Sequence, residues 1–379
     1  MKQNLKKFFA LAVLCLFAVA LLAIPVSAAS SKTVATIGKK NFTSLEKAIS
    51  AVNAGETIVL KTNVTCTSTI TVNRSAKTAF TLDLNGKTLT FKKNACFYLK
   101  KGTVTITNGK IKNTDTKAIK VAKNGTLTIN GGTYQGNIIN QGTMTVKKGT
   151  IKRTSTDYTT TYLISNSGTM TIKGGTFSTT ANLLENKGKL VLSGGKFSSE
   201  GFCIANSTKK GRLTIKGGTF SASSTCVDNS ESASCTITDG TFTSDSGYIV
   251  NNMYSATMKI SGGTFKNTNK SYGHALFCQG SGSVLTVTGG RFTSAFDSIT
   301  CNTGAQVTVS GGTFTMTDNG ILFKAWGGTI RITGGTFKGS NGYKYYEVND
   351  SATSGDTVYK AKVTISSKAK VTARYNKFS

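Results

Sequence analysis

The stretch Thr169-Met-Thr-Ile-Lys-Gly-Gly-Thr-Phe177 recurs, with substitutions, along most of this 379-residue chain. Counting weaker copies, the glycine before its last two residues recurs from Gly86 to Gly335, over 249 residues in 11 steps, a mean period of 22.6 residues. A fixed period of this length is typical of a solenoid. The clear copies end in an aromatic residue at Tyr134, Phe220, Phe265, Phe292, Phe314 and Phe337.

Apolar and polar residues alternate within each copy. Met170 and Ile172 would point to one side, and Thr169, Thr171 and Lys173 to the other. This alternation predicts a β-strand, and Thr and Ile favour a pleated surface. The glycine pair then ends the strand, because glycine adopts backbone angles that other residues resist. Each copy of the repeat therefore predicts a strand followed by a sharp bend.

Two columns of like residues follow if the coils stack in register. The aromatic residues would form one column inside the solenoid, at the inter-strand spacing of about 4.8 Å. Asn residues that follow short apolar runs would form a second, because stacked amides can bond one another. We interpret both columns as structural. The Asn residues are Asn140, Asn166, Asn186, Asn206, Asn229, Asn251 and Asn302.

These repeats resemble the right-handed parallel β-helix family, which has the pectin-lyase-like fold. They resemble in particular the Gly-Gly-Thr-Phe-rich secreted β-helix proteins of Gram-positive bacteria. The resemblance covers roughly Thr33 to Phe337 and implies an all-β, right-handed parallel β-helix with about 22–23 residues per coil. It selects no function, because that fold hosts lyases, hydrolases and adhesins alike. A leucine-rich repeat has a similar period, but the second half of each coil contains nothing that favours a helix.

The sequence predicts four segments. Residues 1–28 have the basic start, apolar run and small-residue site of a secretory signal peptide, with a retained membrane anchor as the alternative. Residues 29–56 are predicted to form an N-terminal cap with a short amphipathic helix, because Thr43-Ser-Leu-Glu46 is a capping-box pattern. Residues 57–339 form the parallel β-helix, and residues 340–379 a last coil and C-terminal cover. No segment after the signal is long and apolar enough to span a bilayer.

The chain is strongly basic, with a formal net charge of +30. Without Lys2, Lys6 and Lys7 of the signal, 43 basic residues face 16 acidic ones. This excess of positive charge either keeps the protein soluble or attracts a polyanion. The expected partners are an anionic polysaccharide, a mucin-type glycan or teichoic acid, or a host surface protein. Specific nucleic-acid binding is not expected, because the chain has no recognised nucleic-acid motif.

The candidate binding residues are outward lysines and a late aromatic cluster. Trp326 replaces a polar corner residue, and it either stacks on a sugar or packs against the C-terminal cover. The candidates are Lys147, Lys173, Lys216, Lys259, Arg331, Trp326, Tyr343, Tyr345 and Tyr346.

Seven cysteines follow the signal, so at least one lacks a partner within the chain. Cys203 and Cys226 are 23 residues apart, as are Cys278 and Cys301, which would place each pair on neighbouring coils. The strand spacing lies near the short end of the range for disulfides. We favour the alternative, that these cysteines are small buried residues with free thiols.

The sequence offers no convincing catalytic constellation. Asp297 and Asp318 lie at similar offsets on consecutive coils and are weak candidates for a hydrolase's paired carboxylates. His274, the only histidine, is expected to be a turn or edge residue. No metal site or cofactor is expected, because neither a cluster of acidic ligands nor Cys/His metal spacing occurs. Thr-x-Thr rows resemble those of ice-binding solenoids, but Lys and Arg interrupt them.

We therefore expect a secreted, non-catalytic β-helix that binds anionic glycans or host and cell-surface molecules, as an adhesin does. It would be extracellular or non-covalently associated with the cell surface. The alternative is a polysaccharide lyase or glycoside hydrolase that acts in a groove along the solenoid. A structural coat protein is a third possibility, and it predicts self-association without a ligand.

Overall fold

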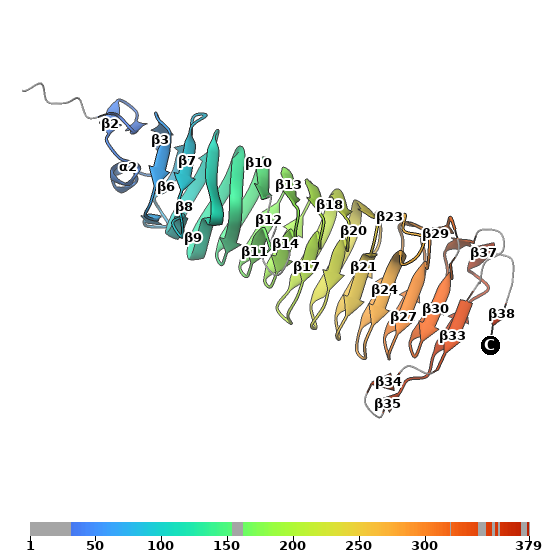
Figure 1. Ribbon diagram of the computed structural model, residues 1–379. Helices are drawn as coiled ribbons and strands as arrows, with labels where there is room; N and C mark the ends of the chain where they lie inside the picture. The colour runs from blue at the N-terminus through green and yellow to red at the C-terminus, as the bar shows by residue number, and fades with distance from the viewer. Residues whose placement is uncertain are drawn as a thin grey trace, which may run out of the picture.

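The computed structural model describes residues 32–153, 162–318, 320–339, 346–350, 353–354, 357–372 and 377–378. Within them the chain winds into a parallel β-solenoid of about 12 turns, each of which we call a coil. Figure 1 shows the strands of successive coils side by side along an elongated molecule. The predicted all-β, parallel β-helix is confirmed. The predicted signal peptide, residues 1–28, lies outside the described residues.

Each coil contributes strands to three faces, which we call face I, face II and face III in the order of the chain. Face I contains β5 (Ile70–Asn73), β11 (Ile164–Asn166), β14 (Leu184–Asn186), β17 (Ile204–Asn206), β19 (Val227–Asn229), β21 (Tyr248–Met253), β24 (His274–Gln279), β27 (Ile299–Asn302), β30 (Phe323–Trp326), β33 (Tyr346–Asn349) and β38 (Lys377–Phe378). The long strands β8 (Phe97–Thr107) and β9 (Lys110–Asn140) run through more than one face.

Face II carries the Thr-x-Thr rows, and face III follows the glycine bend. Face II contains β3 (Thr57–Leu60), β6 (Ala79–Asp83), β12 (Thr169–Ile172), β15 (Lys189–Leu192), β22 (Thr257–Ile260), β25 (Val284–Val287), β28 (Gln306–Val309), β31 (Thr329–Ile332) and β36 (Lys362–Ile365). Face III contains β4 (Val64–Cys66), β7 (Thr88–Phe91), β13 (Thr176–Thr179), β16 (Lys196–Ser199), β23 (Thr264–Asn267), β26 (Arg291–Ser294), β29 (Thr313–Met316), β32 (Thr336–Lys338) and β37 (Lys370–Thr372). Both faces share β10 (Thr143–Arg153), β18 (Arg212–Ala222) and β20 (Ser234–Ser244).

The predicted alternation sorts side chains between the core and the surface. Met170 and Ile172 are fully buried, whereas Thr169 is exposed and Thr171 is half-buried. The bend after the strand needs glycine at Gly175, whose φ is +108° and whose added Cβ would lie 2.8 Å from the carbonyl oxygen of Gly149. The glycine pair therefore lets neighbouring bends approach each other as closely as neighbouring strands do.

The predicted aromatic column is confirmed. Eight phenylalanine rings stack with centroids 4.4–4.8 Å apart and interplanar angles of 3–11°. Register pairing brings these rings together, since each lies opposite the next in face III. The column consists of Phe177, Phe197, Phe220, Phe242, Phe265, Phe292, Phe314 and Phe337.

The asparagine column exists, but two of its predicted members were wrong. Buried amides donate from Nδ2 to the next Oδ1 at 2.7 Å, from Asn140 through Asn252. Asn252 is the member in its coil, not Asn251, because β21 begins earlier and the register aligns Asn229 with Asn252. Cys278 and Cys301 continue the column where Asn302 was expected.

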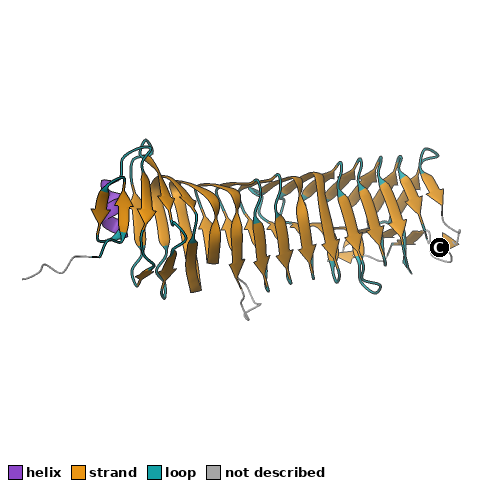
Figure 2. Cartoon of the chain, turned by 90° about the horizontal axis from the view of Figure 1, so that it is seen from above, coloured by secondary structure: helices purple, strands orange, loops and turns teal. Residues whose placement is uncertain are grey.

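The N-terminal end is covered by a short antiparallel pair and a helix, as Figure 2 shows. β1 (Ala35–Ile37) pairs with β2 (Lys40–Phe42) and with β3, and α2 (Leu45–Ala51) buries its apolar side on the first coils. The helix N-cap is Ser44, not the predicted Thr43, because its side chain accepts from the backbone N–H of Lys47. The predicted amphipathic helix is confirmed.

The last coil keeps the register of the three faces. β33, β36, β37 and β38 pair with the strands of the coil before or with one another in parallel. A two-stranded antiparallel hairpin, β34 (Thr353–Ser354) and β35 (Thr357–Val358), lies between β33 and β36 and projects from the solenoid in Figure 1.

All seven cysteines of the described residues are buried free thiols. Cys278 and Cys301 are register partners, as the 23-residue spacing predicted. The thiols of Cys203 and Cys226 donate to the carbonyl oxygens of Ser221 and Thr243, each at 3.1 Å. Cys203 and Cys226 therefore act as small buried residues with a hydrogen-bond partner.

Candidate functional site

Charge is distributed unevenly over the three faces. The outward register positions of face II, from Thr126 and Thr128 to Lys362 and Thr364, contain no Asp or Glu. The outward positions of face III, from β10 to β37, contain none either. Hydroxyl and basic side chains occupy nearly all of these positions. We call these positions of faces II and III, with the bend between them, the basic flank.

The five basic residues proposed from the sequence all lie on this flank. Lys259 and Arg331 occupy the same outward column of face II. Lys147, Lys173 and Lys216 come directly after buried strand residues and border the bend toward face III, where all three are exposed. The structure therefore brings the five to one side of the solenoid, but spreads them over many coils. The five residues form a line of cations along the solenoid, not a compact cluster.

A groove of about 580 Å³ follows the glycine bend in the middle of this flank. Its floor is the backbone of glycines from four successive coils, and its walls carry Thr176, Lys196, Thr219 and Thr241. Asp239 also lines it and is the register partner of Lys216. One Asp239 carboxylate oxygen accepts from the N–H of Gly240 at 2.7 Å, which supports the bend. Glycine backbone and threonine hydroxyls therefore dominate the lining of this groove, with one lysine and one aspartate.

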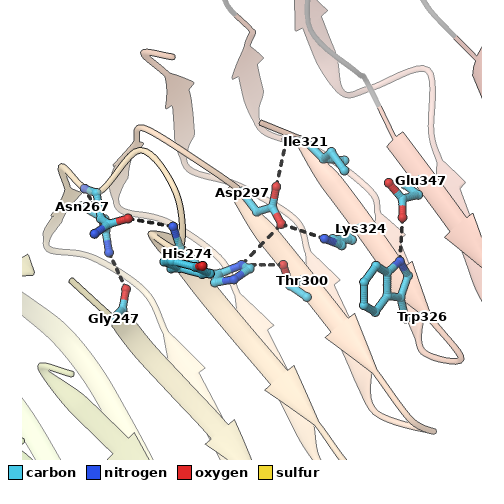
Figure 3. Close-up of polar contacts among 11 residues, drawn as sticks. Gly247, Asn267, His274, Asp297, Thr300, Ile321, Lys324, Trp326 and Glu347 are labelled. Atoms are coloured by element: carbon cyan, nitrogen blue, oxygen red, sulfur yellow. Dashed lines mark hydrogen bonds and ion pairs between the residues drawn. The ribbon is translucent and has the colours of Figure 1, made fainter. Parts of the chain in front are cut away.

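Face I carries a buried polar network near the C-terminal end, which Figure 3 shows in close-up. The Asp297 carboxylate is fully buried, and its Oδ2 lies 3.3 Å from Nζ of Lys324 and 3.6 Å from Nδ1 of His274. Its Oδ1 accepts from the backbone N–H of Ile321 at 3.1 Å. His274 Nδ1 also lies 2.9 Å from the Thr300 hydroxyl. These groups come from three coils, because their strands are stacked in register.

Burial sets the protonation states in this network. It raises the pKa of Asp297, although the nearby Lys324 cation acts in the opposite direction. Burial, assisted by Lys324, lowers the pKa of His274 to about 4, so the imidazole is neutral at pH 7. Asp297 has no exposed surface and so cannot contact a polymer. The network therefore holds neighbouring coils together.

Asp297 and Asp318, the two weak catalytic candidates, have different ionic partners. Asp318 pairs with Lys270 at 2.7 Å, whereas Asp297 pairs with Lys324. A paired-carboxylate hydrolase needs both carboxylates to reach one sugar. The buried position of Asp297 does not meet this requirement. No sequence pattern indicated the contribution of Lys324, which lies 27 residues from Asp297.

Trp326 lies at the end of the Asp297 network and is 38% exposed. Its indole N–H donates to Oε1 of Glu347 at 2.8 Å, and Nζ of Lys324 lies 4.2 Å from a ring centroid. Because Glu347 belongs to the C-terminal segment, Trp326 contacts that segment and still keeps part of its ring exposed. Tyr346 packs partly buried against the core. Tyr343 and Tyr345 lie outside the described residues.

Within the described residues, no group of three or more His, Cys, Asp and Glu side chains could hold a metal ion. The same residues contain no helix of the length and apolar character needed to cross a membrane. No protein-family model, curated protein or solved structure matches the chain. The function is therefore argued from the faces of the solenoid themselves.

Proposed function

We propose that this chain is a secreted, non-catalytic β-helix protein that binds anionic polysaccharides along its basic flank. The observation that carries the proposal is the row of outward hydroxyl and basic side chains on faces II and III from β10 to β37, where the described strands contain a single acidic residue, Asp239 at the bend. Net charge alone does not require this arrangement, because it could be spread evenly over all faces. A one-sided field attracts a polyanion and orients it.

The shape of the flank fits a linear polymer better than a compact ligand. Lys147 and Lys173 lie on consecutive coils, and Lys259 lies further along the axis, with Lys189, Arg212 and hydroxyl side chains at the outward positions of the coils between. Lysine side chains are flexible point charges, so they adapt to carboxylate, sulfate or phosphate groups along a chain. Threonine hydroxyls both donate and accept hydrogen bonds. Acidic polysaccharide, mucin-type glycan and teichoic acid all have the required repeating charge.

The proposal places the protein outside the cell, free or bound to a surface without a covalent link, in an adhesin-like role. The residues that support this placement are the signal-like start of the sequence and the Gly-Gly-Thr-Phe repeats, which resemble those of secreted Gram-positive β-helix proteins. Binding to a host surface protein would use the same flank.

The test compares two variants that each lose three positive charges. Lys147→Gln/Lys173→Gln/Lys259→Gln alters the flank, and Lys39→Gln/Lys40→Gln/Lys47→Gln alters the exposed N-terminal cap. We expect about tenfold weaker binding of polygalacturonate for the flank variant, little change for the cap variant, and weaker binding for both as salt rises. Equal losses in the two variants, or no retention of the wild type at low salt, would contradict the proposal. New reducing ends or unsaturated sugars in the same mixtures would favour an enzyme instead.

A further inference from the structure

A basic pocket of about 540 Å³ lies at the C-terminal end of the basic flank. It forms between two adjacent strands of face II, β31 and β36, and the residues that follow them. Arg331, Lys362 and Lys368 supply three exposed cations, and Thr329, Thr364 and Ser366 supply hydroxyl groups. Among the described residues, no acidic side chain lines this pocket.

The register places the cations around the hydroxyls. Thr329 lies opposite Lys362, and Arg331 lies opposite Thr364, so the two cations are diagonal neighbours. Among the ion pairs of the described residues, none involves Arg331, Lys362 or Lys368. Neighbouring like charges repel one another, and an anion in the pocket would remove that repulsion.

We propose that this pocket binds a tetrahedral oxyanion group, a phosphate or a sulfate, carried by the polyanion. The inference rests on the proposed function, since it names the charged group that one end of the flank recognises. Arginine presents a planar fork of donors to such a group, and the lysines add point charges. The hydroxyls of Thr329 and Thr364 add donors that can rotate toward an oxygen.

The number of donors favours a tetrahedral group over a carboxylate. A phosphate monoester has up to two negative charges and three free acceptor oxygens. A sulfate ester has one charge and three free oxygens, and a carboxylate has one charge and two. The three oxygens of a phosphate monoester or a sulfate can accept from the guanidinium of Arg331 and from both lysines together, whereas a carboxylate has one acceptor oxygen fewer.

The test uses inorganic phosphate, sulfate and acetate as probes at one ionic strength, with binding measured by calorimetry. Arg331→Gln/Lys362→Gln removes two charges from the pocket. Lys39→Gln/Lys40→Gln removes two from the exposed N-terminal cap, away from the flank. We expect saturable binding of phosphate or sulfate to the wild type and to the second variant, and about tenfold or greater weakening in the first. The tighter of the two probes identifies the group.

Two outcomes would overturn the inference. One is acetate binding as tightly as phosphate and sulfate, and the other is unchanged binding in Arg331→Gln/Lys362→Gln. Both variants carry exposed substitutions, which rarely change stability by more than about 0.5 kcal/mol. Polygalacturonate binding, measured in parallel, separates the two ideas. If the wild-type protein binds polygalacturonate but neither phosphate nor sulfate, only the oxyanion pocket is refuted. If it binds phosphate or sulfate but not polygalacturonate, only the function proposed for the flank is refuted.

Discussion

The side-chain amide of Asn186 donates to Oδ1 of Asn206 at 2.7 Å, although 20 residues separate them in the chain. Asn186 also accepts from Nδ2 of Asn166 at 2.7 Å, and its Nδ2 lies 3.0 Å from the carbonyl oxygen of Gly188. All three asparagines are at most 1% exposed. The amides of Asn166 and Asn186 therefore bond both to the next coil and to the bend of their own coil, which fixes the register of face I against face II.

We predict that Asn186→Ala lowers the free energy of unfolding by about 2–4 kcal/mol. The substitution leaves the buried Asn206 side-chain oxygen without its donor, at about 1–3 kcal/mol, and removes the side-chain acceptor of the Asn166 amide, which keeps the Lys189 carbonyl oxygen. Urea denaturation followed by circular dichroism measures the loss. Ser167→Ala, an exposed change in the neighbouring coil, is the control. Equal stabilities of the two variants would show that the ladder contributes nothing.

The glycine bend provides a second prediction. Gly175→Ala combines a φ of +108°, a region that side chains rarely adopt, with a contact of 2.8 Å to the Gly149 carbonyl oxygen. We expect a loss of about 3 kcal/mol. Gly38→Ala also has a positive φ, of +55°, but nothing lies within 4 Å of the added Cβ, so about 1 kcal/mol is expected. Similar midpoints of thermal unfolding for the two variants would contradict this account.

Inward-facing features were predictable from the sequence because they repeat. The Phe177 column and the bend at Gly175 follow from one motif and one period, since stacking copies a residue's environment from coil to coil. The error at Asn251 arose where β21 begins earlier, so counting from the apolar run selected the outward residue and not the inward Asn252. Cys278 continues the asparagine column, but the sequence did not indicate this because its coil has no Asn at that position.

Outward-facing features were less predictable because each depends on three-dimensional register. Asp297 was nominated from its offset in the repeat, but no motif marks its partner Lys324, 27 residues further along the chain. His274 was expected at a turn or an edge, yet it begins β24 and its side chain is 13% exposed. The sequence nominated five outward basic residues, and all of them lie on the basic flank. The scarcity of acidic residues on that flank emerges only after every strand has been assigned to its face.

The buried ion pair provides a third prediction. Lys324→Met leaves Asp297 as an uncompensated buried charge and is expected to cost about 3–5 kcal/mol at pH 7. The folded-state pKa of Asp297 is raised by burial, and removing the cation raises it further. A raised carboxyl pKa favours the folded state at low pH, and this advantage is lost as pH rises through the folded value. The deficit should therefore shrink on acidification.

The double variant Asp297→Asn/Lys324→Met removes both charges and serves as the control for this prediction. It should recover most of the loss, because a neutral amide can still accept from the N–H of Ile321. Denaturation midpoints of the single and double variants at pH 7 and pH 5 complete the comparison. If Lys324→Met is as stable as the wild type at pH 7, the Asp297–Lys324 ion pair is not desolvated in the folded protein.

The buried thiols provide a fourth prediction, on reactivity. Burial raises the pKa of Cys203 to about 11, and also raises those of its neighbour Cys226 and of Cys278. The thiolate is the reactive form, so the folded protein should react very slowly with a disulfide reagent at pH 8, and all thiols should react once it is unfolded. Mass spectrometry after alkylation counts the modified residues. Rapid labelling of Cys203 in the folded protein would contradict its buried, protonated state.

The single histidine provides the last prediction, because its ring gives one resolved proton signal in a nuclear magnetic resonance titration. Burial and Lys324 lower the pKa of His274 to about 4, so its titration midpoint should lie more than two units below that of an exposed histidine. The unfolded chain takes up this proton near pH 6.5 and the folded chain only near pH 4, so folding stability falls as pH drops between these values. The expected loss between pH 7 and pH 5 is about 2 kcal/mol, and His274→Gln should lack this component. A midpoint near 6.5 would mean that the ring is solvated and that the stacking of Tyr248 at 5.1 Å does not enclose it.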